Sequence, residues 1–243
     1  MPKGSPRHTE QRIEGVRPVV EALRAGRRKV LRVQLPEVGR SPGLRELREL
    51  VTATGVTSQP CETAREICAW AEPYPECSFE ELLVRAGPHL LIALDQVTDV
   101  GNLGSIARSA ETAGATGLVL EYRKSVSITP GALRASAGAL EHLPVARTPN
   151  LKRALAIAKS EGFQVLAADG AGPPLASLAD PVFEGSILWV FGSEDRGVRP
   201  SLLESANHRV GIPQRGRIAS LGVAAAAAVL LHQSSERQLR DRG

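Results

Sequence analysis

The stretch "LLIALDQVTDVGNLGSIARSAETAGATGLVL", residues 90–120, contains the unit that the rest of the chain repeats. It begins and ends with short apolar runs, which are typical of buried strands. Between these runs, apolar side chains recur at the spacing of one helix face, at Leu103, Ile106, Ala107, Ala110 and Ala113. Asn102 is a suitable N-cap for this helix, and Gly114 is a suitable stop. The stretch predicts strand, turn, helix and strand, with Arg108 in the helix beyond a glycine-flanked turn.

The same alternation of strand and helix continues to the end of the chain. Apolar runs predict strands over residues 90–94, 117–120, 143–147, 163–168, 187–191 and 209–212. Helices fit between them, for example over 151–162, with Asn150 as cap and Gly162 as stop. Apolar strands that alternate with helices predict an α/β fold whose parallel sheet is covered on both faces. Ligands of such sheets bind beyond the carboxyl ends of the strands.

Composition divides the chain into four regions. Residues 1–12 are polar and are expected to form a flexible basic tail. Residues 13–75 form a small α/β unit, with helices predicted over 17–26, 42–55 and 63–71 and a strand over 29–36. Residues 76–88 are predicted to be a linker with a short helix, because prolines are frequent there. Residues 89–243 form the larger α/β domain.

Three loops at the predicted carboxyl edge have unusual composition. They read "DVGNLGSIAR" (99–108), "GSEDRGV" (192–198) and "PQRGRIASLGVAAAAAVLLHQ" (213–233), the last with a helix expected from about Ser220. Taken singly, each could be an ordinary turn, cap or solvated loop. The chain has no G-x-G-x-x-G fingerprint, no P-loop and no nucleophile elbow. No cluster of His and Cys predicts a metal site.

Positive charge is concentrated at the start of the chain. The whole sequence has a net charge of +4, whereas residues 1–32 hold nine Lys and Arg against three Glu, a net of +6. Such a segment suits a polyanionic partner, although a solvated surface would have the same composition.

The chain has few features of a secreted or membrane protein. Its three cysteines, Cys61, Cys68 and Cys77, lack a zinc-ligand spacing and are expected to be reduced thiols. The N-terminus has no apolar signal region, and the longest apolar run, residues 223–231, is too short to cross a membrane. We therefore expect a cytoplasmic protein without a membrane partner.

Together and in this order, the three loops resemble the SpoU (TrmH) family of RNA ribose 2′-O-methyltransferases, in the SPOUT superfamily. The family's N-x-G-x-x-x-R segment matches Asn102, Gly104 and Arg108, and its G-x-E-x-x-G segment matches Gly192, Glu194 and Gly197. Its I-P…S-L segment matches Ile212, Pro213, Ser220 and Leu221. The resemblance covers about residues 89–235. Residues 13–75 resemble the L30e-like RNA-binding domain of the family's rRNA-modifying branch.

The resemblance implies a trefoil-knotted catalytic domain, a homodimer and the methyl donor S-adenosylmethionine. The implied donor site consists of Gly192, Gly197, Ile212, Pro213 and Leu221. The implied catalytic residues are Arg108, Asn102, Glu194 and Ser220, with Glu194 positioning Arg108. The N-terminal domain would bind RNA through Arg17, Arg27, Arg28 and Lys29. The implied reaction is 2′-O-methylation of large-subunit rRNA, at a guanosine.

One position departs from the family pattern and leaves alternatives open. Family members read S-L-N in the third segment, whereas this chain has Gly222 in place of the asparagine. A noncatalytic RNA-binding relative is therefore one alternative, and a tRNA methyltransferase is another. A nucleotide-binding oxidoreductase is disfavoured by the absent fingerprint.

Overall fold

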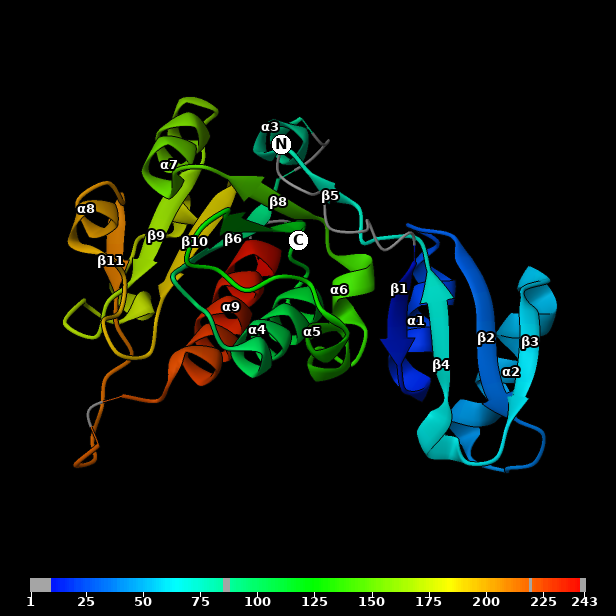
Figure 1. Cartoon of the computed structure of the whole chain (residues 1–243). Coiled ribbons are helices and arrows are strands. Elements are labelled where there is room, and N and C mark those ends of the chain that lie inside the picture. Colours follow the sequence, from blue (N-terminus) through cyan, green and yellow to red (C-terminus); the bar gives the residue numbers. More distant parts are fainter. Residues whose placement is uncertain (1–9, 85–87, 219, 241–243) are drawn as a thin grey trace, which may run out of the picture.

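The computed structural model describes residues 10–84, 88–218 and 220–240. Two sheets organise these residues, a four-stranded sheet near the N-terminus and a seven-stranded sheet in the remainder (Figure 1). The seven-stranded sheet has the order β11-β9-β10-β6-β7-β8-β5, and all of its strand pairs are parallel. Its strands are β5 (Glu76–Cys77), β6 (Leu90–Asp95), β7 (Gly117–Glu121), β8 (Val145–Thr148), β9 (Gln164–Ala168), β10 (Ile187–Gly192) and β11 (His208–Val210). The predicted α/β fold with a parallel sheet is confirmed.

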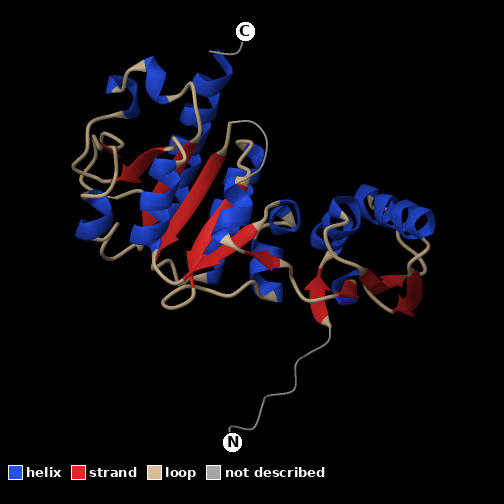
Figure 2. Cartoon of the chain, turned by 90° about the horizontal axis from the view of Figure 1, so that it is seen from above, coloured by secondary structure: helices blue, strands red, loops and turns tan. Residues whose placement is uncertain are grey.

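Helices cover both faces of this sheet (Figure 2). Strand side chains alternate between the faces, so Leu90 and Ile92 join one apolar core while Leu91 and Ala93 join the other. The first core is covered by α4 (Val100–Thr112), α5 (Pro130–Ala135), α6 (Ala139–His142) and α9 (Val223–Arg240). The second is covered by α3 (Phe79–Leu83), α7 (Leu151–Ser160) and α8 (Pro200–Leu203). Short 3₁₀ turns, η2 (Leu175–Ser177) and η3 (Asp180–Val182), lie between β9 and β10.

Helix α4 packs closely on its neighbours. A Cβ atom on Gly104 would lie 2.4 Å from the Cβ of Ala135, so only glycine allows α4 to approach α5. On its other flank α4 contacts α9, where Thr112 Oγ1 lies 3.4 Å from His232 Nε2. Helix α9 is fixed to the sheet by a buried hydrogen bond of 3.0 Å from Trp189 Nε1 to Ser234 Oγ.

The N-terminal sheet has the order β1-β4-β2-β3, with β2 and β3 parallel and the other pairs antiparallel. Its elements are β1 (Gln11–Glu14), α1 (Val16–Ala25), β2 (Val30–Pro36), α2 (Pro42–Thr54), β3 (Thr57–Cys61), η1 (Ala64–Glu66) and β4 (Cys68–Ala71). Helix α1 ends at Gly26 in the left-handed conformation, and Ser41 caps α2. Both helices agree with the sequence prediction.

Three local predictions are corrected by the structure. The N-cap of α4 is Asp99, whose carboxylate accepts from the Asn102 N–H at 2.7 Å, so Asn102 lies inside the helix. The segment over 63–71 ends in strand β4, because it pairs with both β1 and β2. The final helix begins at Val223 and leaves Ser220 and Gly222 in the preceding loop.

The regions expected to be tail and linker contain ordered elements. Residues 1–9 lie outside the described part of the chain, but Gln11 and Arg12 belong to β1. The region 76–88 contributes β5 to the larger sheet, and its helix α3 buries Phe79 and Leu82. The predicted trefoil knot stays a prediction.

A buried ion pair joins the two sheets. Arg28 donates from Nε to Glu141 at 3.0 Å and from Nη2 to the other carboxylate oxygen, and both side chains are 2% exposed. Arg28 also donates to the Glu72 carbonyl at 3.0 Å. Burial raises the pKa of neighbouring Tyr74 to about 12, and its hydroxyl donates to the Leu140 carbonyl at 2.8 Å. These contacts hold the turn between α1 and β2, and the segment that follows β4, against α6.

The substitution Glu141→Ala is expected to lower the free energy of unfolding by about 3–5 kcal/mol, because it leaves the Arg28 charge buried and unpaired. The control is Arg134→Ala, which removes the exposed pair between Arg134 and Glu14 at 2.7 Å and is expected to cost less than about 1 kcal/mol. Urea unfolding of both variants measures the difference. Equal costs would contradict the role given to the buried pair.

Candidate active site

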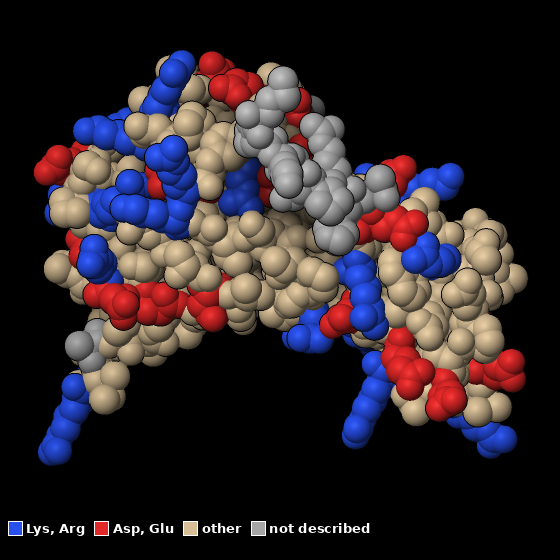
Figure 3. All heavy atoms as spheres, viewed as in Figure 1, with Lys and Arg blue, Asp and Glu red and all other residues tan. Residues whose placement is uncertain are grey.

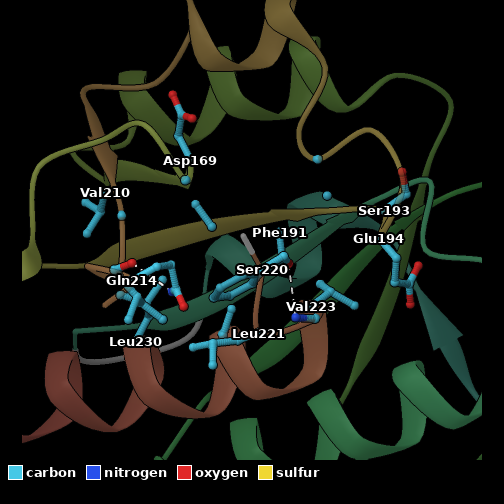
Figure 4. A pocket seen from close by; sticks show the side chains of 18 residues that line it. Asp169, Phe191, Ser193, Glu194, Val210, Gln214, Ser220, Leu221, Val223 and Leu230 are labelled. Atoms are coloured by element: carbon cyan, nitrogen blue, oxygen red, sulfur yellow. Dashed lines mark hydrogen bonds between the residues drawn. The ribbon is translucent and has the colours of Figure 1, made fainter. Parts of the chain in front are cut away.

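A pocket lies at the carboxyl edge of the larger sheet, between the loops after β9, β10 and β11 and the start of α9 (Figure 4). Its empty volume is about 690 Å³, part of which is open to solvent. The lining combines backbone and small side chains with a few polar groups, and it includes Asp169, Gly170, Gly192, Glu194, Gly197, Ile212, Gln214, Ser220, Leu221 and Gly222. The composition suits a ligand held by main-chain hydrogen bonds and apolar contact.

The loop after β10 folds tightly onto its own strand. A Cβ atom on Gly192 would lie 1.9 Å from the carbonyl carbon of Gly197, so no other residue fits at this position. The Gly197 N–H donates to the Ser193 carbonyl at 2.9 Å and closes the loop. This closure keeps Glu194 at the rim of the pocket.

The carboxylate of Glu194 reaches across to α4. It accepts a hydrogen bond from the Asn102 side-chain amide. Asn102 is itself held by the cap contact with Asp99 at the start of the same helix. The first and second loops therefore meet beside the pocket.

A second contact fixes the segment that follows this loop. Asp95, fully buried at the end of β6, accepts from the Arg199 N–H at 2.8 Å and from its Nε at 2.7 Å. Burial raises the pKa of Asp95, and the hydrogen bonds from Arg199 oppose this rise. The chain is thus tied to β6 directly after the loop that ends at Val198.

Residues 89–232 match the family model of the SpoU rRNA methylases. The chain belongs to this family. Within it, the chain is 34% identical over 229 residues to an uncharacterized tRNA/rRNA methyltransferase of Archaeoglobus fulgidus, covering 93% of this chain and 99% of that protein. It is 30% identical over 247 residues to the 23S rRNA (guanosine-2′-O-)-methyltransferase RlmB of Pseudomonas syringae pv. tomato, covering 96% and 98%.

The same fold occurs in a solved SpoU methyltransferase. The structure of AviRb from Streptomyces viridochromogenes, in complex with AdoMet, matches with a TM-score of 0.77 and 23% identity. The match covers 97% of this chain and 94% of that one, and so includes both sheets. This likeness confirms the fold of the whole chain.

Most of the residues matched to the SpoU motifs lie together. The pocket brings together Gly192, Glu194, Gly197, Ile212, Ser220 and Leu221, and Asn102 joins them through Glu194. Pro213 lines a neighbouring cavity with Asp180 and Arg237. Arg108 is exposed on α4 and is not among the residues that line the pocket between β9, β10, β11 and α9. Glu194 contacts Asn102, and no ion pair with Arg108 occurs among the described residues.

The sequence interpretation missed the contribution of the loop after β9. Asp169 and Gly170 line the pocket beside the third motif. The segment "AADGAG", residues 167–172, carried a signal, because an acidic residue and two glycines directly follow a predicted strand.

The proposed RNA contacts of the N-terminal unit divide into two groups. Arg17 and Lys29 have exposed side chains, and Arg17 lies 3.5 Å from Glu46. Arg27 is half-buried and donates to the Leu143 carbonyl at 2.8 Å. The prediction that Arg28 contacts RNA is wrong, because its guanidinium is buried in the ion pair with Glu141.

The described residues also bear on membrane-spanning helices and on metal-binding groups. Among residues 10–84, 88–218 and 220–240, no helix is long and apolar enough to span a membrane. The same described residues contain no group of three or more His, Cys, Asp or Glu side chains placed to hold a metal. Cys61 and Cys68 are free thiols.

The substitution Gly192→Ala is expected to lower the free energy of unfolding by about 1–3 kcal/mol, because the new Cβ would overlap the Gly197 backbone. Gly170→Ala is the matched control, since a Cβ at this pocket residue meets nothing within 4 Å. Thermal and urea unfolding measure both effects. A Gly192→Ala variant as stable as the control would rule out the close contact.

Proposed function

We propose that this chain transfers a methyl group from S-adenosylmethionine to a ribose 2′-hydroxyl of large-subunit rRNA, at a guanosine. The observation that carries the proposal is the pocket in which the second and third SpoU motifs meet, next to the contact of Glu194 with Asn102. Family membership supports RNA methyl transfer. The relative RlmB is a 23S rRNA (guanosine-2′-O-)-methyltransferase that aligns over 98% of its length, which supports a guanosine of 23S rRNA.

The pocket fits the methyl donor. Gly170, Gly197 and Gly222 line it, and a Cβ at each would meet no atom within 4 Å, so the wall there is open backbone. Ile212 and Leu221 supply apolar contact for a flat ring. The main-chain groups of the loop 192–197 supply hydrogen-bond donors and acceptors. When bound, the sulfonium of S-adenosylmethionine supplies a methyl group activated for attack by oxygen. Pro213 lines the adjoining cavity, next to Ile212, which lines both.

Arg108 has the chemistry to act on the acceptor hydroxyl. A ribose hydroxyl is a weak nucleophile; as its oxygen bonds to the methyl carbon, the S–CH₃ bond breaks, S-adenosylhomocysteine leaves and the proton passes to solvent. A guanidinium stays charged in proteins, so Arg108 stabilises the negative charge that develops on the 2′-oxygen and orients a neighbouring phosphate. Glu194 and Asn102 hold the rim of the pocket, and Ser220 shapes its floor through the 3.1 Å hydrogen bond from the Gly222 N–H.

Assembly and RNA binding belong to the same proposal. A homodimer is supported by apolar side chains exposed on α9 and the loop before it, among them Ile218, Val229 and Leu239. Arg108, exposed on the adjacent helix, is accessible to a second copy.

Residues 13–75 act as an L30e-like RNA-binding unit through Arg17 and Lys29, and this unit favours rRNA over tRNA as the substrate.

The substitution Arg108→Ala is expected to lower the methylation rate about 10²–10³-fold, because one electrostatic stabiliser of the transition state is lost. The affinity for S-adenosylmethionine, measured by calorimetry, is expected to stay unchanged. The rate is measured on unmodified 23S rRNA transcripts with mapping of 2′-O-methyl groups, and on tRNA transcripts for comparison. Arg134→Ala, which removes an exposed arginine from α5, is the matched control.

Three outcomes would overturn parts of this proposal. Donor binding without methyl transfer by the native chain would favour a noncatalytic RNA-binding relative. Methylation of tRNA alone would favour the tRNA alternative. An equal loss of donor affinity and rate in Arg108→Ala would show a role in the pocket instead of at the acceptor.

The substitution Gly222→Asn is expected to give no gain in methylation rate. Gly222, in the loop directly before α9, has a φ of 79°, and its carbonyl accepts from the Ala226 N–H at 3.0 Å. Asparagine also tolerates this left-handed conformation. The native chain already satisfies the Gly222 N–H through Ser220. Turnover on 23S rRNA at saturating donor is the measurement, and a large gain would show that the native site is impaired.

A further inference from the structure

A separate cavity opens at the carboxyl edge of the larger sheet, at the ends of β7 and β8. Its empty volume is about 740 Å³. It is lined by Glu121, Arg123, Lys124, Pro149, Asn150, Lys152, Arg199, Ser201 and Leu202, so four cationic side chains face one carboxylate. None of these residues belongs to the three SpoU motifs. Figure 3 shows Lys and Arg side chains gathered on this part of the surface, near α7.

The charges of the cavity are unevenly neutralised. Arg199 forms two ion pairs, from Nε to Asp95 Oδ1 at 2.7 Å and from Nη2 to Glu121 Oε2 at 3.0 Å. Arg123, Lys124 and Lys152 are exposed, and Arg153 extends the exposed basic surface along α7. The wall formed by Arg199 and Glu121 is therefore structural, while the rim carries the excess positive charge.

The loop that carries this rim is fixed from beneath. Arg147, almost buried in β8, donates to the Glu121 carbonyl at 3.1 Å, to Ser125 Oγ at 3.3 Å and to the Val126 carbonyl at 2.9 Å. The Tyr122 N–H donates to the Thr148 carbonyl at 3.0 Å. The side chains of residues 122–124 are thus presented by a backbone that is already ordered, which lowers the entropy cost of binding.

Two features of the loop point to a nucleic acid. Tyr122 is 66% exposed, so its aromatic ring is accessible to a base from solution. Lys124 has a φ of 56°, a left-handed conformation that a lysine rarely adopts and that turns consecutive side chains in different directions. An exposed aromatic ring beside a row of cations is the arrangement that binds single-stranded nucleic acid, by stacking a base and contacting its phosphates.

We propose that the basic loop 121–125 and the first turn of α7 bind a single-stranded segment of the RNA substrate, with a base on Tyr122 and phosphates on Arg123, Lys124 and Lys152. This inference rests on the proposed function, because it makes the segment a part of the methylated RNA. The loop lies at the same edge of the sheet as the pocket, so one strand of RNA can reach both.

The test compares charge and ring variants of the full chain. The charge variants are Arg123→Gln with Lys124→Asn, chosen because asparagine tolerates the left-handed backbone, and separately Lys152→Gln. The ring variants are Tyr122→Ala and Tyr122→Phe. Lys159→Gln is the matched control, because Lys159 lies at the other end of α7 and donates to the Ser205 carbonyl at 3.2 Å.

Two readouts are measured, namely the steady-state constants for 23S rRNA transcripts and the salt dependence of binding to a labelled single-stranded RNA. We expect the charge variants and Tyr122→Ala to raise the KM for RNA about 10-fold with little change in kcat, as expected for lost stacking or phosphate contacts. Each lost phosphate contact is expected to reduce the slope of log affinity against log salt by about 0.7. Tyr122→Ala is expected to leave that slope unchanged, and Tyr122→Phe is expected to behave like the native chain.

The two proposals fail in distinguishable ways. If the loop variants match Lys159→Gln in KM and in salt dependence, the RNA-binding surface is wrong while methylation by the native chain stands. If the native chain methylates no RNA, the proposed function is wrong, and the binding of the labelled RNA still decides whether the loop contacts nucleic acid.

Discussion

The parallel direction of every strand in the larger sheet is the constraint on which the site depends. Because all the strands point the same way, the loops after β6, β9, β10 and β11 emerge at one edge. Segments more than 90 residues apart in sequence then come within hydrogen-bond distance, as Asn102 and Glu194 do. Glycine makes the final approach possible, since the loop after β10 closes against Gly192 with no room for a side chain.

The fold of the chain was largely predictable from the sequence, and the reasons are local. Helices α1, α2 and α7 have amphipathic spacing with glycines or caps at their ends, and these signals act within a few residues. Strands β6, β7 and β10 are buried on both faces and therefore read as apolar runs. Strand β3 is largely exposed and reads "TSQPC". Its residues therefore do not predict a strand, although it pairs with β2.

The candidate site was predictable only in part. The resemblance to the SpoU motifs pointed to the glycines and Glu194, and their place at the carboxyl edge follows from the strand that precedes them. The partner of Glu194 did not follow from spacing, since the choice between Asn102 and Arg108 depends on which face of α4 turns toward the loop. Arg28 could not be separated from the other basic residues for a similar reason. The composition of a basic segment does not predict which of its side chains is buried against a carboxylate far along the chain.

The ion pair between Arg28 and Glu141 also has a consequence for biosynthesis. The two residues are separated by 113 positions, so at about 5–20 residues per second the ribosome makes Glu141 roughly 6 to 23 s after Arg28. The four strands of the N-terminal sheet all lie before Glu76, so their pairing does not wait for the second domain. During that interval the nascent chain exposes a cationic docking surface whose complement has not yet been translated. Engagement of α6 therefore has to follow the folding of the N-terminal sheet by the time that the ribosome needs to reach Glu141.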